Sequence, residues 1–360
     1  MLGELRNRLF CFVTGDLAFA FAAVGIAAAC RIAAVRLFRK EAGGRRTIFV
    51  GDVHGCFDEL MMLLEKCSYD LSKDRLVFVG DVINKGPKSK EVLQWIMNHP
   101  GTDWQAMSSA AVRIDRAPLP SRCLVPSTQE TPTPSDLNFR VKTSDRPSVF
   151  CVLGNHELKI LELSAKLRGQ EKMEKEDEQT KLTRSLTEEE TRFLRGLPFA
   201  VRFEGGELDS SFWPLNPHSL WQRAVAAMGL RRRGPRKAIV VHAGFAPDVS
   251  LEEQDAEVMT HVRNVKSDGT PSASRASGSH WVKTWRTSQK DIVVYGHDAN
   301  RGLCVSRHFV GLDTGCVYGR RLSALILPSG SIVSVQAQQM YAVPGKQISG
   351  WRRWMARKLF

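Results

Sequence analysis

Short apolar runs alternate with stretches of helical periodicity along most of the 360-residue chain. The first clear unit begins at residues 46–53, whose apolar and β-branched side chains predict a strand. The spacing i, i+3, i+4, i+7 of an amphipathic helix follows in Phe57, Leu60, Met61 and Leu64. Because strands and helices alternate in this way, the sequence predicts an α/β fold.

The unit is repeated at residues 75–82, which predict a second strand, and around 92–97, which predict a second helix. Further buried strands are predicted at 149–153, 238–241, 292–295, 322–327 and 332–335. Chemically capable polar residues follow several of these runs. Open α/β sheets bind ligands at the carboxyl ends of their strands, so we expect a site where these polar residues meet.

Five short motifs carry these polar residues. They are Gly51–Gly55 (GDVHG), Gly80–Gly86 (GDVINKG), Gly154–Glu157 (GNHE), His242–Gly244 (HAG) and Gly296–Asp298 (GHD). In this order they resemble the conserved blocks of the calcineurin-like metallophosphoesterases. The later segments HAGFAPDVSLEEQ, VYGHDANRGL and GLDTGCVYGRRLSALILP are similar to the ApaH-like phosphatases, which are related to bacterial diadenosine tetraphosphatase. The resemblance implies a calcineurin-like sandwich of two β-sheets flanked by helices.

The resemblance also implies a metal site. Its ligands would be Asp52, His54, Asp81, Asn155, His242 and His297, holding two divalent ions, with Asp81 bridging both. Carboxylate, imidazole and amide donors suit Mn²⁺, Fe²⁺, Zn²⁺ or Co²⁺, and two such ions can activate a water for in-line attack on phosphorus. By the same resemblance, His156 is the general acid for the leaving oxygen.

The second motif departs from the Ser/Thr protein phosphatases of the superfamily, which have Asp-Arg where this chain has Asn84-Lys85. Asn84 is expected to orient His156 without stabilising an imidazolium by charge. Lys85, Arg263 and Asn155 are the expected phosphate-binding residues, and Lys85 provides a point charge rather than the bidentate fork of arginine. The resemblance therefore favours a phosphohydrolase acting on phosphoanhydride bonds over a protein phosphatase.

Three classes of substrate fit this reading: dinucleoside polyphosphates, 5'-phosphorylated or capped RNA ends, and inorganic polyphosphate. The formal net charge of +13 suits any polyanion and does not choose among them. No dedicated nucleic-acid-binding module is recognisable, and the pattern does not specify an oligomeric state. Serine/threonine protein phosphatase activity remains the second hypothesis, and a membrane-tethered, non-catalytic polyanion-binding protein is the third.

The amino-terminal segment is the other distinctive feature. Residues 9–30 are almost wholly apolar and long enough to cross a bilayer, which predicts a transmembrane helix. Its basic flanks favour an orientation with the catalytic domain in the cytoplasm. A cleaved signal peptide would instead place that domain in a lumen, such as that of a vacuole, and an organellar transit segment would place it inside an organelle.

The predicted organisation follows. Residues 1–45 form the anchor and a basic linker, 46–340 the metallophosphoesterase domain and 341–360 a basic tail, with insertions at 101–147, 205–237 and 266–279. The eight cysteines show no C-x-x-C pair and are expected to be mostly buried thiols.

Overall fold

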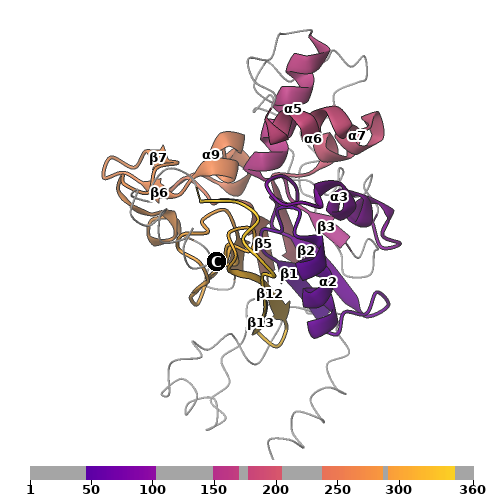
Figure 1. Ribbon diagram of the computed structural model, residues 1–360. Helices are drawn as coiled ribbons and strands as arrows, with labels where there is room; N and C mark the ends of the chain where they lie inside the picture. Colours follow the sequence, from indigo (N-terminus) through magenta and orange to yellow (C-terminus); the bar gives the residue numbers. More distant parts are fainter. Residues whose placement is uncertain (1–45, 103–148, 170–176, 205–236, 287–290, 345–360) are drawn as a thin grey trace, which may run out of the picture. The chain divides into compact units, whose positions relative to one another are not determined.

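The computed structural model describes residues 46–102, 149–169, 177–204, 237–286 and 291–344 (Figure 1). The chain divides into two units, and the fold described here belongs to the second, Arg45–Phe360. The predicted anchor and linker, most of the insertions 101–147 and 205–237, and most of the basic tail lie outside the described residues. Among the helices of the described ranges, none is long and apolar enough to span a membrane.

The first sheet has the strand order β13-β12-β1-β2-β3. Its members are β1 (Arg46–Val50), β2 (Asp74–Phe78), β3 (Val149–Cys151), β12 (Arg321–Leu327) and β13 (Ser331–Gln336). The three early strands are parallel, and β12 runs antiparallel to β1 with Ile48 opposite Ile326. The indigo and yellow ends of the domain therefore lie side by side in this sheet (Figure 1).

The second sheet has the order β10-β11-β9-β5-β4. It consists of β4 (Ala200–Glu204), β5 (Lys237–Val241), β9 (Asp291–Tyr295), β10 (Cys304–Val305) and β11 (Phe309–Gly311). Strands β5, β9 and β11 are parallel, and the edge strands β4 and β10 are antiparallel to their neighbours. The sequence predicted β5 and β9 but not the other three strands.

The two sheets pack face to face through large apolar side chains. The ring of Phe203 in β4 contacts Phe49 of β1 and Phe150 of β3, with centroid distances of 6.2 and 5.2 Å. Successive strand residues point to opposite faces, so Val240 belongs to this central core while Val241 belongs to a second core on the outer face. The predicted α/β sandwich of two sheets is confirmed.

Helices follow the strands of the first sheet. They are α2 (Phe57–Lys66), α3 (Ser89–Asn98), α5 (Asn155–Arg168), α6 (Glu178–Ser185) and α7 (Glu188–Gly196). Helix α2 packs on β12 and β13 through the apolar side it presents at Leu60, Leu63 and Leu64, and α5 packs on α6 and α7. Helices α2 and α3 start just after a polar motif, and α5 starts inside one, at Asn155.

A small layer lies beyond the second sheet. It contains η4 (Leu251–Glu253), α9 (Ala256–His261), η5 (Trp281–Lys283) and a three-stranded sheet of β7 (Pro271–Ser272), β6 (Asn264–Val265) and β8 (Ser279–His280). The predicted insertion 266–279 supplies β7 and the start of β8. The buried rings of Phe245 and Trp281 join this layer to the outer core.

Candidate active site

The predicted ligands lie in loops at the carboxyl ends of strands from both sheets. Asp52 and His54 follow β1, Asp81 follows β2, and His242 and His297 follow β5 and β9. His54, Asp81 and His297 adopt positive φ values of 47°, 50° and 70°. Such conformations are unfavourable for residues other than glycine and are typical of functional loops, where the surrounding structure holds them.

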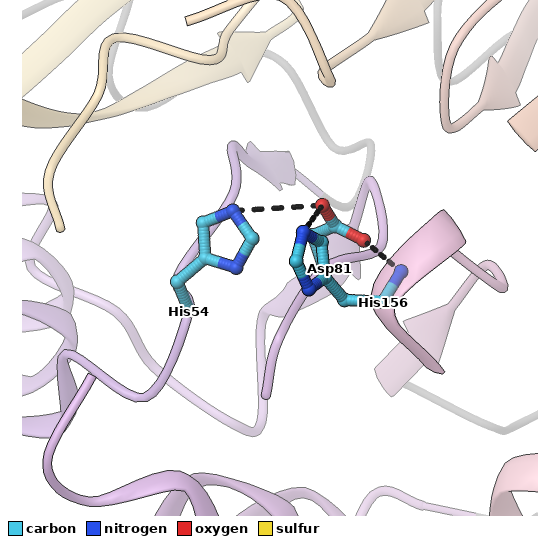
Figure 2. Close-up of side chains that lie close together, drawn as sticks. All are labelled: His54, Asp81 and His156. Carbon is cyan, nitrogen blue, oxygen red and sulfur yellow. Dashed lines mark hydrogen bonds and ion pairs between the residues drawn. The ribbon is translucent and has the colours of Figure 1, made fainter. Parts of the chain in front are cut away.

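Asp81 lies at the centre of the site. Figure 2 shows its carboxylate beside the imidazoles of His54 and His156. Its Oδ2 atom is 3.5 Å from Nε2 of His54, and its Oδ1 atom is 3.4 Å from Nε2 of His242 and accepts the His156 backbone N–H over 2.9 Å. One carboxylate therefore contacts side chains from both halves of the site, as a bridging ligand must.

The tautomers of three histidines follow from their backbone partners. A carbonyl oxygen only accepts hydrogen bonds, so the ring nitrogen that faces it carries the proton. The pairs are His54 Nδ1 with the Ile83 carbonyl (3.4 Å), His242 Nδ1 with the Val79 carbonyl (2.9 Å) and His297 Nε2 with the His261 carbonyl (3.2 Å). The other nitrogen of each ring directs its lone pair into the site, which is the arrangement of metal-binding histidines.

Two of these ring nitrogens lie close to each other and to the side-chain oxygen of Asn155. Oδ1 of Asn155 is 3.0 Å from both Nε2 of His242 and Nδ1 of His297, and the two ring nitrogens are 3.2 Å apart. With both ring protons on backbone carbonyls, three lone pairs face one another. This donor set fits a cation, which removes the repulsion between the lone pairs.

Asp52 shows the same need for a cation. Its Oδ2 accepts the His297 backbone N–H over 3.0 Å, but the buried Oδ1 has no hydrogen-bond partner. Burial, the Asp313 carboxylate and the Asp81 carboxylate raise the pKa of Asp52 well above its ordinary value. A divalent ion would stabilise its charged form. The residues present therefore fit the two ions that the resemblance implies.

The imidazoles are in the form that binds metals. The pKa values of His54, His242 and His297 lie below the ordinary value of a histidine, mainly because the rings are buried. These rings are therefore neutral near pH 7, and a neutral ring offers a lone pair.

His156 lies beside the ligands and is oriented by Asn84. The Asn84 amide nitrogen is 2.7 Å from Nδ1 of His156, and its Oδ1 accepts the Lys85 backbone N–H over 2.8 Å. Because the second bond orients the amide, its N–H₂ faces the ring, so Nδ1 accepts and the proton lies on Nε2. Burial is the main cause that lowers the pKa of His156 to about 4.

The two basic residues predicted to bind phosphate, Lys85 and Arg263, lie in different surroundings. Nζ of Lys85 lies 2.9 Å from Nε2 of His54 and 5.4 Å from the ring centroid of Tyr318, so it reaches the ligand cluster. Arg263 donates from Nη1 to the Ala273 carbonyl over 3.1 Å, and its buried Nε has no hydrogen-bond partner. In the described part of the chain, Arg263 forms no hydrogen bond with the six predicted ligands.

Glu157 is a site residue to which the sequence analysis gave no role. Its fully buried carboxylate accepts the backbone N–H groups of Asp81, Ile83 and Gly154 over 2.8, 3.1 and 3.0 Å. Burial, followed by the charge of Asp81, raises the pKa of Glu157 to about 8. Glu157 is the third residue of α5, and an acidic residue there was the signal for a role at the helix amino terminus.

Comparison with known proteins identifies the family. The model of the calcineurin-like phosphoesterase family matches residues 45–301. The chain therefore belongs to this family of metallophosphoesterases and is a hydrolase, which confirms the resemblance drawn from the five motifs.

More specific similarities point in the same direction. The chain is 26% identical to the symmetrical bis(5'-nucleosyl)-tetraphosphatase of Dechloromonas aromatica strain RCB, over 84% of this chain and 99% of that protein. It is 26% identical to the protein of the same name in Cellvibrio japonicus strain Ueda107, over 80% and 97%. A crystal structure described as a candidate diadenosine tetraphosphatase matches with 27% identity and a TM-score of 0.53, over 82% and 95%. The ApaH-like resemblance is thus confirmed.

Proposed function

We propose that the chain is a metal-dependent phosphohydrolase that cleaves a phosphoanhydride bond in dinucleoside polyphosphates. The convergence of lone pairs from Asn155, His242 and His297 beside the Asp81 carboxylate supports this most directly. The names of the relatives support the substrate class. RNA ends and inorganic polyphosphate remain further candidates because they contain the same bond or the same charged groups.

The metal ligands divide into two groups around Asp81. Asp52, His54 and Asp81 would hold one ion, and Asp81, Asn155, His242 and His297 would hold the other. When bound, two divalent ions supply a water of lowered pKa and neutralise phosphoryl charge.

The side chains around the ligands provide the remaining chemistry. His156 carries a proton on Nε2, which lies 4.0 Å from Oδ2 of Asp81, and this N–H group would donate a hydrogen bond to the leaving oxygen. Lys85, at 2.9 Å from the His54 ring, contributes positive charge where phosphate charge develops. Asn84 keeps the imidazole in the tautomer that has its proton on the side of the ligands.

The same contact weighs against a protein phosphatase. The superfamily members with that activity carry an aspartate at the position of Asn84, and a carboxylate there accepts a hydrogen bond from Nδ1–H and stabilises the imidazolium. In this chain the N–H₂ group of Asn84 faces Nδ1 and gives no such stabilisation.

The test is a substrate screen with the purified full-length chain loaded with Mn²⁺, Co²⁺ or Zn²⁺. Diadenosine tetraphosphate is the main substrate, and inorganic polyphosphate, 5'-triphosphorylated RNA and phosphopeptides are tested beside it. We expect the highest kcat/KM with diadenosine tetraphosphate and ADP as the product, because symmetrical cleavage gives two ADP molecules. A higher value with phosphopeptides would support the protein phosphatase, and binding of these substrates without turnover would support the non-catalytic protein.

We further propose that residues 9–30 anchor the chain in a membrane with the catalytic domain in the cytoplasm. The support is their length, their apolar composition and their basic flanks. Alkaline carbonate extraction of cells that express the full chain should leave it in the membrane pellet, and protease added to intact organelles should digest the catalytic domain. Release into the supernatant would contradict the anchor.

A further inference from the structure

A second group of metal-binding side chains lies outside the ligand set described above. The sulfur atoms of Cys56 and Cys316 and a carboxylate oxygen of Glu59 all lie within 4.8 Å of one another. The residues are buried, with exposed fractions of 1%, 1% and 0%. Among the described cysteines, Cys304 is half-buried and has no comparable surroundings.

The fold brings these residues together from two distant segments. Cys56 precedes the first turn of α2 and Glu59 lies three residues later, so both lie on the same side of that helix. Cys316 comes from the turn between β11 and β12, where its carbonyl accepts the Gly319 backbone N–H over 2.9 Å.

Glu59 provides the second observation that points to a ligand. Its Oε1 accepts the Gln338 backbone N–H over 2.9 Å and the Tyr341 hydroxyl over 2.8 Å. Its Oε2 is buried and has no hydrogen-bond partner. No lysine or arginine of the described ranges forms an ion pair with this carboxylate. A buried carboxylate with one oxygen unsatisfied requires a partner, and a cation is the partner that matches its charge.

We propose that Cys56, Glu59 and Cys316 bind a zinc-type divalent cation in a third, structural metal site. Zinc binds thiolate sulfur at about 2.3 Å and carboxylate oxygen at about 2.0–2.2 Å in tetrahedral geometry. Ligand atoms at those distances lie about 3.5–3.8 Å apart, which the observed cluster reaches with small side-chain movements. Binding displaces the thiol protons to solvent, and a water completes the four ligands.

The chemistry of this site differs from that of the catalytic centre. The predicted catalytic ligands supply only nitrogen and oxygen atoms, whereas this cluster supplies two sulfur atoms. The ion would join the start of α2, two residues after His54, to the turn that carries Tyr318, the ring under the Lys85 ammonium. It would therefore hold the loops on one side of the catalytic centre without taking part in the reaction.

Cobalt titration tests the proposal on the reduced full-length chain. Co²⁺ bound to thiolate gives an intense near-ultraviolet charge-transfer absorption, which nitrogen and oxygen ligands do not give. We expect the wild type to show this absorption, saturating at one equivalent of thiolate-bound Co²⁺. Cys316→Ser should abolish it, and the matched control Cys304→Ser should keep it. Absence of the absorption in the wild type would overturn the proposal, whether or not the chain hydrolyses phosphoanhydrides.

Glu59→Gln and a zinc count extend the test in case Cys316→Ser does not fold. The glutamine retains the size of the side chain and an oxygen for the Gln338 N–H, so the circular dichroism spectrum should match that of the wild type. We expect Glu59→Gln to raise the dissociation constant of the thiolate-bound Co²⁺ at least about tenfold. After dialysis, the wild type should hold one more zinc ion than the variant. Equal zinc contents, or a wild-type mass short by two hydrogens as in a Cys56–Cys316 disulfide, would overturn the proposal.

Discussion

The side-chain amide of Asn84 donates a hydrogen bond to Nδ1 of His156 over 2.7 Å, and the Lys85 backbone N–H orients that amide. This contact places the ring proton on the nitrogen that faces the ligand cluster. It follows that the amide and the imidazole act as one unit, and that their substitutions should affect the rate without affecting metal binding.

His156→Asn should retain the metal and lose about 10²–10⁴-fold in kcat, because the imidazole N–H that would face the leaving oxygen is lost. Asn84→Ala should lose less, about 10–100-fold, since the ring remains but is no longer oriented. Steady-state kinetics with diadenosine tetraphosphate and elemental analysis provide both readouts. His308→Asn is the control, because that ring contacts only the Asp291 carbonyl among the hydrogen-bonding groups of the described residues. Wild-type turnover in His156→Asn would refute its role.

Asp81→Asn should lose both metal and turnover, the latter by more than about 100-fold, because the residue contacts ligands of both proposed ions. Asp177→Asn is the matched control, since asparagine caps a helix as well as aspartate and Asp177 caps α6. Elemental analysis and kcat should separate the two variants. A metal content equal to that of the wild type in Asp81→Asn would contradict the bridging role.

Asp52→Asn should lower stability only when metal is present. In metal-free protein the substitution removes a buried charge whose pKa is raised by burial and by Asp313 and Asp81, so Tm should rise or stay unchanged. With Mn²⁺ present the variant should melt below the wild type, because it has lost an anionic ligand. Differential scanning calorimetry with and without a chelator measures both, and the same sign in both conditions would contradict a ligand role for Asp52.

Lys85→Gln should lower kcat/KM by about 10–100-fold, because a positive charge near the reacting phosphate is lost while the metal ligands remain. Lys88→Gln is a suitable control, since Lys88 is a partly exposed residue that pairs with Asp58. The metal content should be unchanged in both variants. Equal kcat/KM values for Lys85→Gln and the wild type would remove Lys85 from the proposed site.

His280 should make the fold sensitive to acid. Burial and then the charge of Arg301 lower its pKa from 6.5 to about 4. The unfolded chain therefore binds the proton more readily, so the contribution of His280 is fully present above about pH 6.5 and is lost as the pH falls towards 4. The Tm of the wild type should fall more than that of His280→Asn between pH 7 and pH 5. Equal falls would show that another group is responsible.

Much of the fold follows from local patterns. The sequence shows the apolar runs of β1, β2, β5, β9 and β12 and the apolar stripe of α2. These patterns are visible because the side chains that each element buries are apolar and recur at the spacing of a strand or a helix. Strands β4, β10 and β11 were not predicted because their sequences are short or mixed in polarity. Only pairing with a neighbouring strand defines them.

The sequence alone determined which side chains are candidates for the chemistry. Glycine-flanked aspartates and histidines after strands mark the predicted ligands, because both the residue type and the sharp turn are local properties. The spacing of the cysteines predicted that they are mostly buried thiols, and four of the five described cysteines are buried.

The tertiary structure decided how those side chains meet. His242 and His297 come from separate strands, and only the packing of the second sheet places their ring nitrogens 3.2 Å apart. The tautomers depend on the carbonyls of Val79 and His261, and the Cys56–Glu59–Cys316 cluster depends on a turn far along the chain. Contacts between distant segments arise when apolar surfaces are buried together, so the pattern of any one segment does not contain them.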